Sequence, residues 1–378
     1  MKRILLLVAP LYVTASLGIS ASALAASPFP LRMELRVPFD PTAFPSAGRT
    51  FMMYELYLAN FSGSTIDLRR IEVLDADQRA GQPVASFEGE QLDALLQSSD
   101  AKSTEDPNLR RVKPNETLVV FMQVAFDAQT RVPNRLRHRV ITGDSSLEGA
   151  IVDTHHTELK VLVPPLRGSA WHASDGPSND RVNHHRRGGF MVDGRLSISG
   201  RYATDWFLIK DGALQKGDTR DRQSYYSYGQ PVFAVGSGTI VTARDGLPDN
   251  VPGPVETFQP AIPKSLQTIT GNTIVLDLGR GQYASYFHLQ PGSLRVKTGD
   301  YVHSGDPLAR VGVSGDSNVP HLHFEITTSP NTLAGEGVPY VIEQYRVKSA
   351  GDIWQTVTHE LPMRDVLVDF GPADGNAN

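Results

Sequence analysis

Short runs in which apolar and polar residues alternate recur through the first half of the chain. Successive side chains of a β-strand point to opposite faces, so this alternation is typical of strands that bury one face. Turn-forming residues such as Asn60 to Ser64 separate the runs, and one short helix is predicted at 90–97. Strands are expected at 33–39, 54–59, 66–73, 116–126, 136–142 and 151–163. This half is therefore predicted to be an antiparallel β-sandwich-like module without a catalytic site.

The alternating pattern breaks at Pro164-Pro165 and Gly168, which indicates a domain boundary. With 378 residues, the chain is long enough for two or three domains. We expect an accessory domain at 27–165, a second mostly β domain at 166–370 and a flexible tail at 371–378. Residues 171–183 are rich in Ser, Asp, Asn, Gly and Pro and are predicted to be a loop. His138 is flanked by arginines and is expected on the solvated surface.

Residues 1–26 have the pattern of a cleavable export signal. Lys2 and Arg3 precede an apolar run that is too short to span a bilayer comfortably, and Ala23-Leu24-Ala25 is a typical cleavage site. An uncleaved membrane anchor is the alternative. We expect an exported protein, periplasmic or secreted, with no membrane contact after cleavage. The net charge of -5 and the lack of a long basic run argue against nucleic acid as a partner.

Four polar residues stand inside ordered apolar segments of the second domain. His321 and His323 are two residues apart in the run 320–325, so a strand directs both to one face. Asp205 lies in Thr204-Asp205-Trp206-Phe207, where an unpaired carboxylate is costly. His288 ends a hairpin predicted at 272–289 with its turn at 279–281. The alternatives are solvated histidines on a strand surface, a salt bridge between Asp205 and an arginine, and a structural role for His288.

These residue types point to zinc chemistry. The chain has no cysteine, so a zinc site would have to use histidine and carboxylate ligands, and a catalytic zinc takes three protein ligands. Such a zinc lowers the pKa of its bound water to about 7, and further histidines can move protons and stabilise an oxyanion. The sequence contains no HExxH, Walker or GxSxG motif and no GxGxxG after a strand. A cysteine nucleophile is excluded by composition.

Several short motifs follow one another in the second domain. They are Gly229-x-Pro231-Val232-x-Ala234 with Gly238, Gly271-Asn272, Tyr286-x-His288-Leu289, Gly299-Asp300-x-Val302, Gly312 with Ser314-Gly315, and His321-Leu322-His323-Phe324. In this order they resemble the M23 peptidase family, the lysostaphin- and LytM-type zinc endopeptidases of bacterial cell walls. The resemblance covers most of the second domain and none of the first. It implies that His323 and Asp205 bind zinc and that His288 and His321 are catalytic.

The chain departs from the family pattern at one ligand. The family carries its first zinc ligand four residues before the aspartate, as HxxxD, and this position is Arg201. Arginine does not ligate zinc, so His184-His185 is the nearest alternative donor. Similar proteins with a histidine just before a double arginine favour His185. An extended backbone would let only one of the two histidines face the site, which leaves His184 as the alternative.

The expected function is that of an exported zinc metalloendopeptidase that hydrolyses peptide stems or cross-bridges of peptidoglycan. A regulatory protein is a further candidate partner. The alternative is a degenerate, non-catalytic module that binds the cell wall or regulates another hydrolase, which Arg201 favours. A lipoyl- or biotinyl-type carrier is a weaker alternative, because such domains need an attachment lysine at a hairpin tip and are cytoplasmic. Arg186 and Arg187 are expected either to be solvated or to grip a substrate carboxylate.

Overall fold

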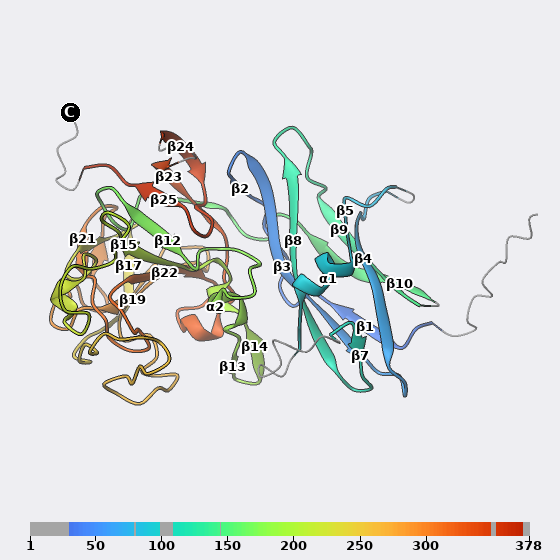
Figure 1. Cartoon of the computed structure of the whole chain (residues 1–378). Helices are drawn as coiled ribbons and strands as arrows, with labels where there is room; N and C mark the ends of the chain where they lie inside the picture. The colour runs from blue at the N-terminus through green and yellow to red at the C-terminus, as the bar shows by residue number, and fades with distance from the viewer. Residues whose placement is uncertain (1–29, 79–80, 99–108, 144, 349–352, 373–378) are drawn as a thin grey trace, which may run out of the picture.

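The computed structural model describes residues 30–78, 81–98, 109–143, 145–348 and 353–372. The predicted export signal lies outside these residues, as does most of the predicted tail, and the predicted domain limits stay predictions. The described chain is mostly β, as the sequence predicts, with one group of sheets formed by each half (Figure 1). No helix in the described part is long and apolar enough to cross a membrane.

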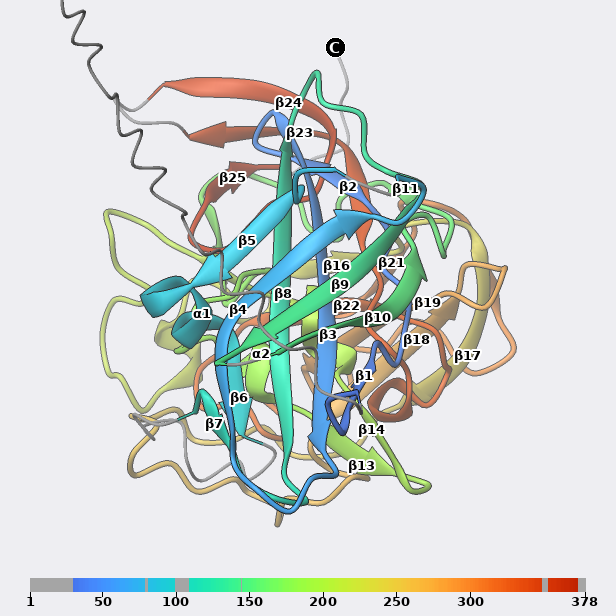
Figure 2. The same cartoon turned by 90° about the vertical axis from the view of Figure 1, so that its right-hand side faces the viewer.

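Two five-stranded antiparallel sheets form the first half, here called the N-terminal sandwich. Helix α1 (Gly89–Leu95) lies beside them, close to its predicted position (Figure 2). The side chains between the sheets form one apolar core. The first sheet contains β1 (Met33–Arg36), β2 (Phe44–Ser46), β3 (Arg49–Asn60), β6 (Leu96–Ser98) and β8 (Thr117–Asp127). The second contains β4 (Ile66–Asp75), β5 (Ala85–Glu88), β7 (Arg111–Val112), β9 (Arg135–Thr142) and β10 (Ser146–Asp153).

His138 is fully buried in this core, so the expectation that it is solvated was wrong. On strand β9 its side chain alternates with the arginines and lies on the same face as Leu136 and Val140, which also are buried. The Tyr54 hydroxyl lies 2.8 Å from its Nε2 atom, and the Ala150 carbonyl lies 2.8 Å from its Nδ1 atom. Both ring nitrogens thus have hydrogen-bond partners, which offsets the free-energy cost of burying the polar ring.

An eleven-stranded sheet dominates the second half. Along it lie β11 (Lys160–Leu162), β23 (Tyr340–Lys348), β25 (Leu367–Asp369), β12 (Trp171–Ser174), β15 (Thr204–Leu208), β22 (Leu322–Thr327), β19 (Tyr283–Leu289), β18 (Asn272–Asp277), β17 (Gly238–Arg244) and β20 (Tyr301–Val302), while β24 (Trp354–Glu360) pairs with β23. Small two-stranded sheets join β13 (Phe190–Val192) to β14 (Arg195–Ser197) and β16 (Pro231–Phe233) to β21 (Pro307–Arg310). Short helices are α2 (His184–Arg187), η1 (Ser199–Tyr202), η2 (Arg222–Ser224) and η3 (Thr332–Ala334).

The segment predicted as a loop at 171–183 begins with a strand. β12 pairs with β15 on one side and with β25 on the other, and Trp171 at its start is buried. Both partners lie far away in the sequence, so the local composition gives no sign of them. The hairpin of β18 and β19, in contrast, forms as the sequence predicts.

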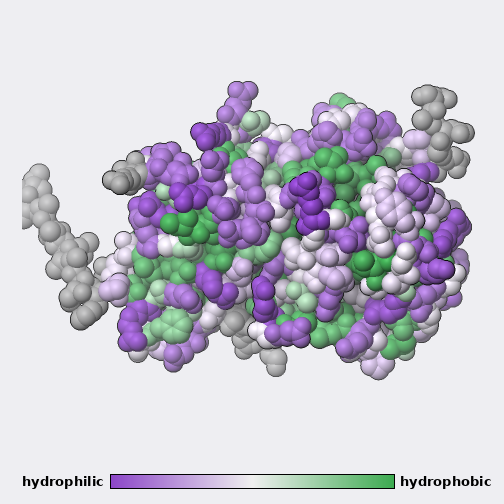
Figure 3. All heavy atoms as spheres, turned by 180° about the vertical axis from the view of Figure 1, so that it is seen from behind, coloured by the Kyte–Doolittle hydropathy of each residue, from purple (hydrophilic) through white to green (hydrophobic). Residues whose placement is uncertain are grey.

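Strand β3 is buried on both of its faces. Tyr54, Leu56 and Leu58 pack into the N-terminal sandwich. Met53 packs instead with residues of the second half such as Tyr202, whose hydroxyl donates a hydrogen bond to the Met53 carbonyl. The two halves therefore share an apolar contact, and seen from behind they form one continuous body (Figure 3).

Candidate metal centre

The site is built around one cross-strand pair. Asp205 on β15 lies directly opposite His323 on β22, and the two side chains point to the same face. The Nδ1 atom of His323 lies 3.0 Å from Oδ1 of Asp205. On the other side of His323, the ring of Phe287 from β19 stacks on it at a centroid distance of 4.8 Å. This packing fixes the imidazole plane beside the carboxylate.

His321 reaches the same carboxylate oxygen, as the spacing of two residues predicts. Its Nε2 atom lies 3.5 Å from Oδ1 of Asp205, and its ring stacks on Phe207. The Val319 carbonyl lies 2.8 Å from its Nδ1 atom. A carbonyl can only accept a hydrogen bond, so the proton of a neutral His321 lies on Nδ1 and Nε2 is left bare toward the site.

A β-bulge turns His288 into the site. The register of β18 against β19 shifts between Asn272 and Ile274, and His288 has a positive φ of 60°. Such a conformation is rare for a residue other than glycine. In a regular strand, the neighbours Phe287 and His288 would point to opposite faces of the sheet. The bulge lets both rings lie on the face of the site, where the His288 ring lies 4.9 Å from that of His321. The Ser314 carbonyl, 2.8 Å from Nδ1, leaves Nε2 of His288 bare as well.

The two candidate first ligands come from helix α2, and not from an extended segment as expected. The Asn183 side chain caps this helix by accepting a hydrogen bond from the His185 backbone N–H. The helical turn brings both imidazoles to Asp205. Nε2 of His185 lies 3.4 Å from Oδ1, and Nε2 of His184 lies 3.6 Å from Oδ2. The expectation that only one of them could face the site was therefore wrong.

The two histidines differ in burial and in partners. His185 is buried, its Nδ1 atom lies 2.7 Å from the Asp175 carbonyl, and its Nε2 atom has no hydrogen-bond partner. His184 is more than half exposed, and its Nδ1 atom lies 2.6 Å from the Asp175 carboxylate. A ring N–H that donates to a carbonyl or a carboxylate is the usual support of a metal-binding histidine. Both have this support, but only His185 holds a buried, unpartnered nitrogen at the site.

Burial and neighbouring charges set the protonation of the cluster. Burial alone would raise the pKa of Asp205, but His321 and His185 together hold it well below its usual value. Burial lowers the pKa of His185 and, with help from the neighbouring His321 and His323, that of His288. Burial would also lower the pKa of His323, but its bonds to Asp205 and Glu325 raise it to about 10.

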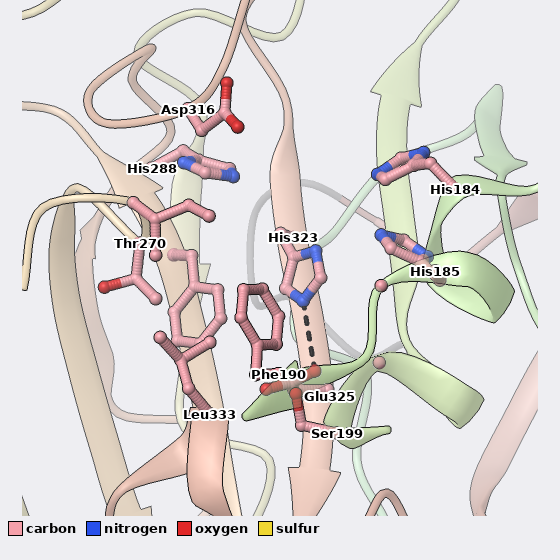
Figure 4. A pocket seen from close by; sticks show the side chains of 14 residues that line it. His184, His185, Phe190, Ser199, Thr270, His288, Asp316, His323, Glu325 and Leu333 are labelled. Carbon is pink, nitrogen blue, oxygen red and sulfur yellow. Dashed lines mark hydrogen bonds and ion pairs between the residues drawn. The ribbon is translucent and has the colours of Figure 1, made fainter. Parts of the chain in front are cut away.

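A cavity of about 130 Å³ opens beside these residues. His184 and His185 stand on one side of it, His288 stands on the other, and His323 lies between them (Figure 4). Because one water molecule occupies roughly 30 Å³, the cavity has room for a few waters or one peptide group, and the rest of a substrate would lie along the surface.

Glu325, like Asp175, is a residue of this site that was not predicted from the sequence. It is buried, and its Oε2 atom lies 3.3 Å from Nε2 of His323 (Figure 4). The period of two that puts His321 and His323 on one face also puts Glu325 there, so the signal was present in the run 320–325. A carboxylate behind a histidine fixes the tautomer in which the other ring nitrogen is bare.

Neither arginine of interest enters the cavity. Arg201, at the position of the family's histidine, is buried against Glu55, with 2.7 Å between Nε and Oε1. Arg186 is also buried, and its guanidinium donates to the Asn179 and Ala94 carbonyls. The hypothesis that Arg186 grips a substrate carboxylate or is solvated was therefore wrong, because its side chain is buried and both terminal nitrogens donate inside the protein.

The donor set fits a zinc ion. His184, His185 and Asp205 each offer a ligand atom, and these atoms lie within 4.8 Å of one another. Nδ1 of His323 adds a further nitrogen 3.0 Å from Asp205. Histidine nitrogens and a carboxylate oxygen are the ligands that catalytic zinc takes in proteins without a cysteine ligand. This group of close, mostly buried donors could hold a metal ion.

Comparison with known proteins gives the family. Residues 224–334 match the model of peptidase family M23, so this part of the chain is similar to that family. The matched segment contains His288, His321 and His323 and begins after Asp205 and helix α2. Family M23 uses zinc. A search of curated proteins found no match to the chain.

Solved structures that the search matched to the chain include the catalytic domain of the antimicrobial peptidase lysostaphin from Staphylococcus simulans, with 23% identity over 45% of this chain and 88% of that one and a TM-score of 0.25. A putative M23 peptidase from Pseudomonas aeruginosa has 16% identity over 71% and 90%, with a TM-score of 0.23. The deep-sea M23 metalloprotease pseudoalterin has 14% identity over 55% and 100%, with a TM-score of 0.27.

Proposed function

We propose that the protein is an exported zinc metalloendopeptidase that hydrolyses peptide bonds in bacterial peptidoglycan. The single observation that supports this most strongly is the meeting of Asp205, His185 and His323 with two further histidines, His288 and His321, beside a cavity that His185, His288 and His323 line. Three donors suffice to hold the metal, and two bare imidazole nitrogens are left over for proton transfer. Family M23 and the export pattern of the first residues support the substrate and the compartment, periplasmic or secreted.

His185, Asp205 and His323 are the residues proposed to hold zinc. When bound, zinc supplies an acidified water and polarises the carbonyl of the scissile bond. His185 binds through Nε2, because the Asp175 carbonyl fixes its proton on Nδ1. His323 binds through Nδ1, because Glu325 takes the proton on Nε2. His184, with its carboxylate partner and its exposed ring, remains the alternative first ligand.

His288 and His321 are proposed to move protons. Each carries its proton on Nδ1 and presents a bare Nε2 to the site. Such a nitrogen can accept a proton from an attacking water, and the resulting imidazolium can donate a hydrogen bond to the tetrahedral oxyanion. The strained φ of His288 agrees with a functional role, since backbone strain of this kind gathers at active sites.

Release of peptides from purified peptidoglycan, followed by mass spectrometry, tests the proposal. The zinc-loaded wild-type chain should release peptides, and His321→Ala should lose roughly 100- to 10,000-fold in rate while it keeps its zinc. His303→Ala changes an exposed histidine that follows the terminal strand β20 of the sheet, so it is the matched control and should keep the wild-type rate. A zinc-loaded wild-type chain that releases nothing would instead favour a non-catalytic module that binds the wall or regulates another hydrolase.

A further inference from the structure

Helix α2 has two faces with different partners. His184 and His185 turn toward Asp205, whereas Arg186 turns toward the N-terminal sandwich. The Arg186 guanidinium donates to the Ala94 carbonyl at the end of α1 with a distance of 2.9 Å, and it lies over the ring of Phe121 on β8 at 4.6 Å. The candidate ligands His184 and His185 are thus followed directly by Arg186, whose buried side chain is anchored in the other half of the chain.

The loop that leads into α2 is held by the same surface. Asn179 donates from its side chain to the Phe121 carbonyl with a distance of 2.6 Å and accepts from Arg201 at 2.6 Å. Arg181 donates to the Asp93 carbonyl. Arg201 reaches on to the Met122 carbonyl. Segment 179–186 is therefore fixed on β8 and α1 of the sandwich by charged and amide side chains.

On its other side α2 rests against helix η1 of the second half. A Cβ atom at Gly200 would lie 3.4 Å from Cβ of His185, so the two elements pack at ordinary van der Waals distance there. The helix is enclosed between η1 and β8. Removing either support would leave a four-residue helix, and a helix of this length has no stability of its own in water.

We infer that the N-terminal sandwich is a structural part of the metal centre, and that Phe121 and Arg186 are positioning residues for the histidine ligand on α2. The inference rests on the proposed zinc site. A metal ligand must be held in place by residues whose own positions are locked, and loss of such support typically weakens metal affinity. Here that support crosses from one half of the chain to the other, because the histidine that the family pattern places next to Asp205 is replaced by Arg201.

The test compares two phenylalanines of one strand. Phe121 and Phe126 are both buried on β8, but Phe121 lies under Arg186 at the contact between the halves, whereas Phe126 packs inside the sandwich. Zinc dissociation constants of Phe121→Leu, Phe126→Leu and Arg186→Lys would be measured by competition with a chelator, and thermal unfolding would check that each variant is folded.

We expect zinc affinity to fall roughly 10- to 100-fold in Phe121→Leu and in Arg186→Lys, and to stay within about twofold of wild type in Phe126→Leu. Arg186→Lys keeps the positive charge but loses the planar guanidinium and its stacking on the Phe121 ring. If Phe121→Leu fails to fold, the zinc affinity of Arg186→Lys alone tests the inference. Unchanged affinity in the folded variants would overturn the inference and leave the proposed function intact. A wild-type chain that takes up no zinc would overturn both.

Discussion

Arg201 and Glu55 form a buried ion pair that joins the two halves of the chain, with 2.7 Å between Nε and Oε1. Their side chains are only 2% and 10% exposed. Arg201 stands where the family pattern has a zinc-binding histidine, and its charge is used for the contact between the halves. Under the proposed function, helix α2 would supply the imidazole that the pattern expects at position 201.

This pair predicts a non-additive effect on stability. Arg201→Met leaves Glu55 as a buried charge without its partner, which should lower the free energy of unfolding by about 3–5 kcal/mol. The double variant Arg201→Met, Glu55→Leu should recover most of that loss, because no unpaired charge remains. Urea unfolding of the single and double variants measures both values. A loss below about 1 kcal/mol in the single variant would contradict the account.

The first zinc ligand can be identified by comparing the zinc affinities of alanine variants of His184 and His185. His185→Ala should weaken zinc binding by more than the roughly 100-fold that loss of a supporting partner costs, because it removes a buried ligand. His184→Ala should change affinity less than about tenfold. Zinc competition titrations of the two variants give the answer. The opposite order of the two losses would make His184 the ligand.

Glu325 should act on zinc through His323. Glu325→Leu removes the acceptor of the His323 Nε2 proton and should weaken zinc binding roughly 10- to 100-fold, whereas Glu325→Gln retains an acceptor and should lose less. Glu343→Leu, at an exposed position of β23, is the control in the same assay and should bind zinc like wild type. Equal affinities for Glu325→Leu and wild type would show that His323 is oriented by other contacts.

His138 predicts a pH dependence of stability that is separate from the metal site. Burial lowers its pKa to about 4 from a usual value of about 6.5. Between these values the unfolded chain binds a proton that the folded chain does not, so stability falls as the pH falls from about 6.5 to about 4. The displacement corresponds to about 3 kcal/mol.

Unfolding curves measured at several pH values check this effect. The slope of stability against pH in this window should be smaller in His138→Gln and unchanged in His155→Gln, an exposed histidine close to it in the sequence. A wild-type slope in His138→Gln would mean that other groups carry the acid sensitivity.

Local patterns sufficed for much of the molecule. Alternation predicts most strands of the sandwich and both arms of the hairpin of β18 and β19, and the spacing of His321 and His323 puts both at Asp205. These features depend on side-chain period, which a sequence displays directly. The M23 motifs, quoted in chain order, correspond to the matched family segment.

The remaining features depend on contacts between distant residues. Strand β12 is defined by partners on both sides that are remote in sequence. The alternating residues around Glu55 are typical of a strand with one exposed face, but in the folded chain the second half covers that face. Helix α2 is too short to have a periodic signature, so the simultaneous approach of His184 and His185 was not foreseen. The bulge at His288 is equally invisible, because it arises from a register shift between two strands.

The zinc content of the purified chain tests the central claim most directly. It would be measured by elemental analysis after dialysis against metal-free buffer, and again after zinc has been added and the excess removed. The account predicts about one zinc per chain, held without the histidine of the HxxxD pattern. A chain that holds no zinc and takes up none on addition would contradict it, and the cluster around Asp205 would then be a non-catalytic ion-pair network.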